Sequence, residues 1–331
     1  MIITKSPMRL SFLGGGTDQE EYFNLHGGFC LNASINKYVY VLTLDQPKFV
    51  DDKFKFTYRK TESVSSHYNF EHPVVREILR KLNWQIPLNI ATMADLPGNS
   101  GLGSSSAFTC ALIANLMKRN KIELDQKDIA REAIEMERKI LNEPGGWQDQ
   151  ISTAYGGLRA IEFNSNGFKV SENLLFDDFR AYFSERSILV RLPSLRVNKE
   201  AALINSKMIS NMAGIKNLNK IKEIALLTYN QWEKSTDTQE KYEIIADGIK
   251  QSWILKSQWG KHVLSFEVKN ILNAIKKIKI DAFKTLGSGD AGFALILASP
   301  SSINKICSIF SEDDVINFNL TNDRTKVIEI E

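Results

Sequence analysis

Cysteine is scarce in this chain, which has only Cys30, Cys110 and Cys307 among 331 residues. The three are far apart, and no Cys-x-x-Cys spacing occurs. An odd number at such spacing excludes a disulfide framework and a zinc knuckle, and it favours a reducing, cytoplasmic setting. The four histidines also lack the spacing of metal ligands.

A strong charge of one sign and a long hydrophobic run are also missing. Lys and Arg number 42 against 39 Asp and Glu, and the net charge of +3 is too small to favour a nucleic-acid partner. Lys5 and Arg9 interrupt the apolar N-terminus, which therefore does not resemble a secretory signal. The most apolar stretch, residues 107–117, is well short of the about 20 residues that span a bilayer. We expect a small-molecule partner, whereas the oligomeric state is left open.

The order of the elements predicts an α+β protein of two domains, because strands and helices do not alternate regularly as in a doubly wound sheet. Residues 199–277 have an almost wholly helical pattern, whereas the residues before them have a strand-rich one. The change from one pattern to the other near 188–198 predicts the boundary between domains 1–190 and 191–331. The period-two segments predict strands at 2–5, 38–44, 53–58, 88–93, 158–163, 188–192, 281–286, 293–298, 315–320 and 327–330. Helices are predicted at 72–82, 104–119, 125–141, 147–155 and 302–310.

A loop rich in glycine and serine joins the strand at 88–93 to the helix at 104–119. Its residues are Pro97, Gly98, Asn99, Ser100, Gly101, Leu102, Gly103, Ser104, Ser105 and Ser106. Closely spaced glycines and the amides of a helix N-terminus bind anions. A plain turn with a serine cap is the alternative, but the apolar helix behind the loop favours phosphate binding. The loop has no Gly-Lys-Ser/Thr and is not a P-loop.

Two carboxylates follow this loop. Glu137 falls on the apolar stripe of the helix at 125–141, where it either forms a salt bridge or binds a magnesium ion. Asp149 follows Gly145-Gly146 at the start of a short helix. It either stabilises the helix dipole or orients and deprotonates a hydroxyl, and spacing alone does not separate these roles.

Glycine-rich segments also lie near both ends of the chain. Arg9 lies inside an apolar strand, where it either pairs with Glu20 or Glu21 or balances charge in a phosphoryl transfer. Asp18, after a triglycine, suits sugar hydroxyls. Residues 287–292 match Gly-x-Gly-x-x-Gly, but a strand follows instead of a helix, which excludes a dinucleotide site and leaves a phosphate or sugar site.

These segments together resemble the three ordered motifs of the GHMP small-molecule kinases. The motifs are Ser6-Pro-Met-Arg with Gly-Gly-Gly-Thr-Asp18, Pro-Gly-Asn-Ser-Gly-Leu-Gly-Ser-Ser-Ser-Ala at 97–107, and Lys-Thr-Leu-Gly-Ser-Gly-Asp-Ala-Gly-Phe at 284–293. The resemblance covers nearly the whole chain. Within the family, the triglycine start and Gly-Gly-Trp-Gln-Asp-Gln at 145–150 are similar to the sugar anomeric kinases, above all those of D-glycero-D-manno-heptose 7-phosphate.

The resemblance implies a ribosomal-protein-like N-terminal domain and a ferredoxin-like C-terminal domain, with ATP and substrate between them. The loop at 97–106 would hold the ATP phosphates, and Ser105 with Glu137 would bind Mg²⁺. Asp149 would face the acceptor hydroxyl with electrostatic help from Arg9. The residues implied for substrate binding are Gly15, Gly16, Thr17, Asp18, Gly287, Ser288, Gly289, Asp290 and Arg196.

The implied reaction is phosphorylation of the anomeric hydroxyl of a sugar phosphate, heptose 7-phosphate giving the 1,7-bisphosphate, for nucleotide-activated heptose and surface polysaccharide. A kinase for a free sugar such as fucose and a non-catalytic sugar sensor of the same fold remain as alternatives. The third motif departs from the glycine-rich pattern of the heptose kinases at Ser288, Asp290 and Ala291. Arg191 and Arg196 are further candidates for binding a substrate phosphate.

Overall fold

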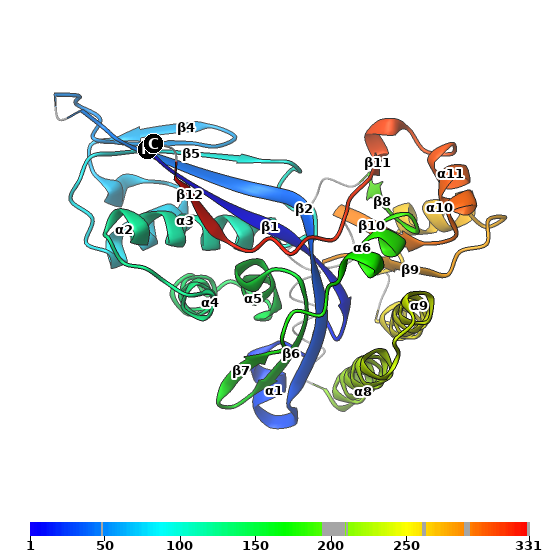
Figure 1. Ribbon diagram of the computed structural model, residues 1–331. Helices are drawn as coiled ribbons and strands as arrows, with labels where there is room; N and C mark the ends of the chain where they lie inside the picture. Colours follow the sequence, from blue (N-terminus) through cyan, green and yellow to red (C-terminus); the bar gives the residue numbers. More distant parts are fainter. Residues whose placement is uncertain (48, 194–208, 210, 260–262, 288–291, 330–331) are drawn as a thin grey trace.

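Two long antiparallel strands, β1 (Ile2–Leu13) and β2 (Gly28–Asp45), run through the larger of two sheets (Figure 1). The computed structural model describes residues 1–47, 49–193, 209, 211–259, 263–287 and 292–329. The larger sheet has the order β12-β1-β2-β5-β3-β4, and β6 pairs with the first half of β2 and with β7. Because β2 is 18 residues long, one half pairs with β5 and the other with β6.

The remaining elements have the following bounds. The other strands are β3 (Phe54–Thr57), β4 (Thr61–Val64), β5 (Leu88–Ala94), β6 (Leu158–Asn164), β7 (Gly167–Val170), β8 (Ser187–Leu192), β9 (Ala282–Thr285), β10 (Gly292–Leu297), β11 (Val315–Ile316) and β12 (Lys326–Glu329). The helices are α1 (Glu20–His26), α2 (Pro73–Lys81), α3 (Ser104–Arg119), α4 (Gln126–Ile134), α5 (Gln148–Tyr155), α6 (Asp177–Ser184), α8 (Met212–Lys234), α9 (Thr238–Lys256), α10 (Phe266–Ala274) and α11 (Pro300–Cys307). A π-helix spans Glu135–Ile140, and short 3-10 helices span His67–Asn69 and Glu312–Asp314.

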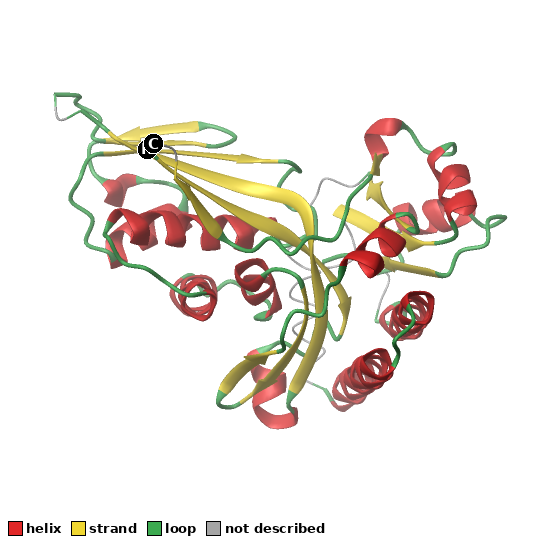
Figure 2. Cartoon of the chain, in the orientation of Figure 1, coloured by secondary structure: helices red, strands yellow, loops and turns green. Residues whose placement is uncertain are grey.

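Helix α3 is the centre of the larger core. It is buried on all sides from Ser106 to Leu116 and contacts β1, β2, α4 and α5. The helices α2 to α5 lie on one face of the large sheet (Figure 2). A helix with no polar face must be buried, as its sequence pattern predicts. This burial fixes the position of the glycine-serine loop at its N-terminus.

The smaller sheet is antiparallel, in the order β11-β8-β10-β9. A separate apolar cluster, including Val190, Ile271 and Ile296, packs between this sheet and helices α10 and α11. The chain then returns to the larger sheet, where β12 pairs with β1. The expected boundary after residue 190 falls inside β8, and the division of the chain into 1–190 and 191–331 stays a prediction.

The two sheets are joined by helices and by a buried lysine. Helices α8 and α9 pack on each other, and both contact β1. Lys284 of β9 donates hydrogen bonds from Nζ to the carbonyl oxygens of Ser11 and Phe12 in β1. Burial lowers the pKa of Lys284 well below its usual range. These contacts hold the third glycine motif against the N-terminal strand.

Several elements differ from the sequence prediction. The helix expected over 125–141 divides into α4 and the π-helix, and the strand expected over 315–320 is only two residues long. The elements α1, β7 and α6 were not predicted. They are short, and short amphipathic segments are stabilised mainly by tertiary packing. No helix in the described ranges is long and apolar enough to cross a membrane.

Candidate active site

The glycine-serine loop has the backbone conformation of an anion-binding nest. Asn99, Gly101 and Gly103 all have positive φ angles, of 64°, 72° and 71°. Gly103 is the N-cap of α3, and no side chain forms a hydrogen bond that caps the helix. Alternating left-handed residues and an uncapped helix N-terminus direct backbone N–H groups to one side, where an anion binds. The loop is therefore suited to hold phosphate groups, and we call residues 97–106 the phosphate nest.

The second and third glycine motifs, at 97–107 and 284–293, pack directly on each other. A Cβ at Gly101 would lie 2.8 Å from the carbonyl oxygen of Leu286, and one at Gly292 would lie 2.3 Å from the carbonyl oxygen of Ser100. Only glycine permits this approach of two backbones. Gly287 also lines the polar cavity described below. Ser288, Gly289, Asp290 and Arg196 fall outside the described residues.

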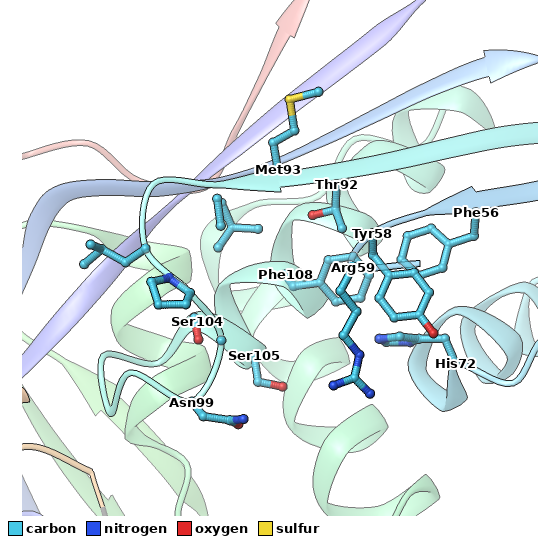
Figure 3. A pocket seen from close by; sticks show the side chains of 15 residues that line it. Phe56, Tyr58, Arg59, His72, Thr92, Met93, Asn99, Ser104, Ser105 and Phe108 are labelled. Carbon is cyan, nitrogen blue, oxygen red and sulfur yellow. The ribbon is translucent and has the colours of Figure 1, made fainter. Parts of the chain in front are cut away.

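An apolar cavity of about 390 Å³ opens beside this loop (Figure 3). Phe56, Tyr58 and Phe108 form its wall, and Arg59 extends into the space next to Ser105. The loop residues that line it are Pro97, Gly98, Asn99, Ser104 and Ser105. An apolar wall next to a phosphate nest suits a flat aromatic base and its phosphates.

Arg9 and Asp149 form a bidentate ion pair. Arg9 Nε lies 2.9 Å from Asp149 Oδ1, and Arg9 Nη2 lies 2.7 Å from both carboxylate oxygens. Arg9 Nη1 donates a 2.7 Å hydrogen bond to the carbonyl oxygen of Gly101. Arg9 is only 4% exposed, whereas the Asp149 side chain is 25% exposed. The pairing of Arg9 with Glu20 or Glu21 is wrong, because β1 directs Arg9 toward the start of α5.

Asp149 lies between the phosphate nest and a polar cavity of about 210 Å³, which we call the acceptor cavity. A Cβ at Gly103 would lie 3.6 Å from Asp149 Oδ2, so the nest and the carboxylate are in contact. The residues that line the acceptor cavity are Arg9, Gly15, Gly16, Asp18, Gln19, Arg138, Pro144, Gly145, Gly146, Gln148, Asp149, Lys256, Trp259 and Gly287. The folded chain thus brings three separate motifs to one carboxylate.

Asp18 is 2% exposed and is held by backbone amides. Its Oδ1 accepts a hydrogen bond from Gly16 N at 2.9 Å, and its Oδ2 accepts one from Gln148 N at 3.2 Å. Burial raises the pKa of Asp18, the Gly16 amide opposes that shift, and the charge of Asp149 adds to it. Thr17 does not line the cavity, because its hydroxyl lies beneath the turn and bonds to the carbonyl oxygen of Gly14.

Glu137 is 1% exposed, as its place on the apolar stripe predicts. Its Oε2 accepts hydrogen bonds from Ser106 Oγ at 2.9 Å and from Gln150, and it lies 3.5 Å from Arg138 Nη2. The π-helix directs this carboxylate toward α3, and such segments are frequent at functional sites. Ser105, in contrast, is exposed on the apolar cavity, and the structure places Ser106 beside Glu137 instead.

The residues around Glu137 fit a magnesium ion. Glu137 Oε1 is buried and has no hydrogen-bond partner in the described structure, so it is available to a cation. The described residues contain no group of three or more His, Cys, Asp or Glu that could hold a metal. Mg²⁺ is commonly held by one or two carboxylates with substrate phosphates and water. Glu137, with a serine of the loop, matches this incomplete protein site.

The Glu137→Gln variant tests this role. We expect the magnesium concentration for half-maximal activity to rise about 10-fold or more, because the neutral amide is a weaker ligand than a carboxylate. Titration of MgCl₂ at fixed ATP measures the effect. Glu135→Gln is the matched control, since Glu135 lies in the same π-helix but is exposed and pairs with Lys81 at 3.0 Å. An unchanged titration in Glu137→Gln would contradict the assignment.

Lys256 and Trp259 are among the residues of the acceptor cavity that were not anticipated from the sequence. Lys256 and Trp259 lie at and just beyond the end of α9, and both approach the triglycine. No motif surrounds them, and the helical pattern around them indicates only packing. Arg191, a candidate for phosphate binding, instead pairs with Asp314 at 2.6 Å. That pair also lowers the pKa of Asp314, after the hydrogen bond from Ser311.

Comparison with known proteins agrees with this geometry. Residues 69–157, which include the phosphate nest, Glu137 and Asp149, match the GHMP kinases N terminal domain. The chain is 26% identical over 348 residues to the D-glycero-alpha-D-manno-heptose 7-phosphate kinase of Campylobacter jejuni subsp. jejuni, covering 98% of each chain. It is also 26% identical over 219 residues to the bifunctional fucokinase/GDP-fucose pyrophosphorylase of Arabidopsis thaliana, covering 64% of this chain and 20% of that protein.

The fold has a close counterpart among solved structures. A D-glycero-D-manno-heptose 1-phosphate kinase from Bacteroides thetaiotaomicron matches with a TM-score of 0.80 and 22% identity, covering 100% of both chains. The expected two-part α+β fold is thereby confirmed. The match at residues 69–157, the named kinases among the relatives and the convergence of the three glycine motifs on Asp149 support a phosphotransferase that is similar to the GHMP kinases.

Proposed function

We propose that this protein is an ATP- and magnesium-dependent kinase that phosphorylates the anomeric hydroxyl of a sugar phosphate, D-glycero-D-manno-heptose 7-phosphate. The product is the 1,7-bisphosphate, on a cytoplasmic route to nucleotide-activated heptose for surface polysaccharide. The relative from Campylobacter jejuni, which is similar along nearly its whole length, supports this substrate. The solved structure of similar fold is named a heptose 1-phosphate kinase. It supports the same sugar, although its name puts the phosphate at position 1 instead of position 7.

The main support for the proposal is the position of the Arg9–Asp149 pair. Asp149 borders the phosphate nest on one side and the acceptor cavity on the other. A hydroxyl in that cavity attacks the terminal phosphorus of ATP, its proton passes to Asp149 or to solvent, and ADP leaves. Arg9 fixes the orientation of the carboxylate through three hydrogen bonds and offsets its charge. Phosphoryl transfer depends mainly on such positioning and charge stabilisation.

The nucleotide is assigned to the apolar cavity and the nest. Its base would pack against Phe56 and Phe108, and its phosphates would lie over the loop at 97–106. Arg59, which extends into this cavity, would supply positive charge that the loop lacks without a P-loop lysine (Figure 3). Mg²⁺ bound by Glu137 and a loop serine would neutralise charge on the phosphates. Among the loop serines, Ser105 borders the apolar cavity and Ser106 contacts Glu137.

A kinase for a free sugar such as fucose is the second candidate, favoured by the similarity to the Arabidopsis fucokinase protein over 219 residues. A sensor without catalytic activity is disfavoured, because binding alone requires neither the Arg9–Asp149 pair nor the buried Glu137.

The test is ADP release with Mg²⁺ and ATP, measured against heptose 7-phosphate, mannose, fucose and galactose, with Asp149→Asn as the blank. We expect turnover only with the heptose phosphate. Turnover of a free sugar alone would replace the proposed substrate and keep the kinase. Sugar binding without any ADP release would instead support the sensor.

A further inference from the structure

Lys256 reaches the acceptor cavity from the second half of the chain. It is the last residue of α9, and its Nζ lies 3.5 Å from the position that a Cβ would occupy at Gly15. Trp259 lies three residues further along the chain, and a Cβ at Gly16 would lie 3.3 Å from the Trp259 ring. The ammonium group of Lys256 and the indole ring of Trp259 therefore lie against the backbone of the triglycine. Lys256 thus lines the cavity next to Gly15.

Lys256 forms no hydrogen bond or ion pair with another described residue. Its ammonium lies 5.5 Å from the centre of the Trp259 ring, and its side chain is half-buried. Burial lowers the pKa of Lys256, and the charge of Asp18 partly offsets this effect. A desolvated cation without a hydrogen-bonded anion is unfavourable. The site is therefore more favourable with an anion bound next to Lys256.

The other charged groups that line the cavity already have partners. Arg9 pairs with Asp149, and Asp18 accepts two backbone amides. Arg138 donates to the carbonyl oxygens of Gly146, Glu143 and Pro144 at 3.1 to 3.3 Å. Lys256 thus differs from the other cations of the cavity wall, because its ammonium group donates no hydrogen bond to another described residue.

We infer that Lys256 binds an anionic group of the acceptor, a phosphate ester remote from the hydroxyl that receives the new phosphate. This inference rests on the proposed function and deepens it, because it makes Lys256 the residue that distinguishes a sugar phosphate from a free sugar. The ATP phosphates are assigned to the nest beside Gly103, which contacts Asp149 from the other side, whereas Lys256 lies over Gly15. An ammonium group and a phosphate form strong charge-assisted hydrogen bonds.

The test compares heptose 7-phosphate with the same heptose lacking its phosphate, in the wild-type enzyme and in Lys256→Met. Hydrogen bonds to charged groups predict that the variant raises KM for the sugar phosphate about 10- to 100-fold. We expect kcat to change little, and KM for ATP and kcat/KM for the free sugar to stay nearly unchanged. Lys256→Arg, which keeps the charge, should restore part of the preference for the phosphate.

Lys250→Met is the matched control, because Lys250 lies on the same helix and is exposed. Circular dichroism shows whether each variant is folded. An equal loss of kcat/KM for both sugars in Lys256→Met would overturn the inference, since Lys256 would then act on the sugar or on the shape of the cavity. An unchanged KM for the sugar phosphate would also overturn it.

A failure of the proposed function gives a different result. If the wild-type enzyme releases no ADP with either sugar, the proposed substrate is wrong, and calorimetry with heptose 7-phosphate then decides the role of Lys256. Binding to the wild type that is at least about 10-fold weaker in Lys256→Met supports the inference. Equal binding to both, or no binding to either, overturns it.

Discussion

The Asp149→Asn variant should lower kcat at least about 1000-fold, within the range expected when a residue that accepts or orients a proton is lost. Asparagine has nearly the same size, but it cannot accept the proton of the acceptor hydroxyl or pair with Arg9 as an anion. ATP binding should be nearly unchanged, because the phosphate nest and the apolar cavity consist of other residues. Steady-state kinetics and calorimetry with ATP measure the two effects separately.

The control for this variant is Asp178→Asn. Asp178 is an exposed aspartate in the first turn of α6, away from the acceptor cavity. It should keep normal kcat. Because Arg9 is buried and loses its charged partner in Asp149→Asn, thermal unfolding of both variants should also be compared. Activity near the wild-type level in a folded Asp149→Asn protein would remove Asp149 from the reaction.

The Gly146→Ala variant should lower kcat/KM for the acceptor at least about 100-fold, since small misplacements near the chemistry have effects of this size. The new Cβ would lie 1.9 Å from Asp18 Oδ2 and 2.2 Å from Asp18 Cγ. The carboxylate must therefore leave its place between the amides of Gly16 and Gln148. KM for ATP should change little, and stability should fall by about 1–3 kcal/mol, as is typical of overpacking.

Gly167→Ala is the comparison for this prediction. Gly167 has a φ of 115° and no heavy atom within 4 Å of the added Cβ, so the change strains only the backbone of a surface strand. It should reduce stability without reducing kcat/KM. If Gly146→Ala retained full activity toward the acceptor, then the position of Asp18 would not matter for substrate binding.

The acceptor cavity depends on contacts between segments that are far apart in the sequence. The Arg9–Asp149 pair joins β1 to α5 across 140 positions, and Lys284 joins β9 to β1 across 273 positions. Together, these contacts hold the three glycine motifs around the carboxylate of Asp149. A change that loosens β9 from β1 would therefore disturb the acceptor site without touching it directly.

The local patterns of the sequence predicted the backbone conformation of the glycine-serine loop well, whereas phosphate binding by this loop stays a prediction. The glycines at 98, 101 and 103 lead into an apolar helix, and the structure gives Asn99, Gly101 and Gly103 the positive φ values of a nest. The burial of Glu137 also followed from helical spacing, since positions three and four residues apart share one face. These features depend on near neighbours in the chain, which periodicity describes.

The partner of Arg9 and the partners of Glu137 could not be predicted in this way. Arg9 had acidic neighbours at Glu20 and Glu21, yet the sheet directs it to Asp149. The π-helix at Glu135–Ile140 changes the direction of Glu137, so that Ser106 rather than Ser105 contacts it. Such choices depend on the packing of α3 against α4 and α5, which propensity and spacing do not describe.

By itself, the sequence determined the α+β class, the glycine-serine nest, the burial of Glu137 and the family resemblance, because each depends on residues close together in the chain. Only the tertiary structure decided that Arg9 pairs with Asp149 and that Lys256 and Trp259 cover the triglycine. Those contacts join elements more than 100 positions apart. Their geometry follows from how two sheets and the α8–α9 pair pack together, which no local pattern specifies.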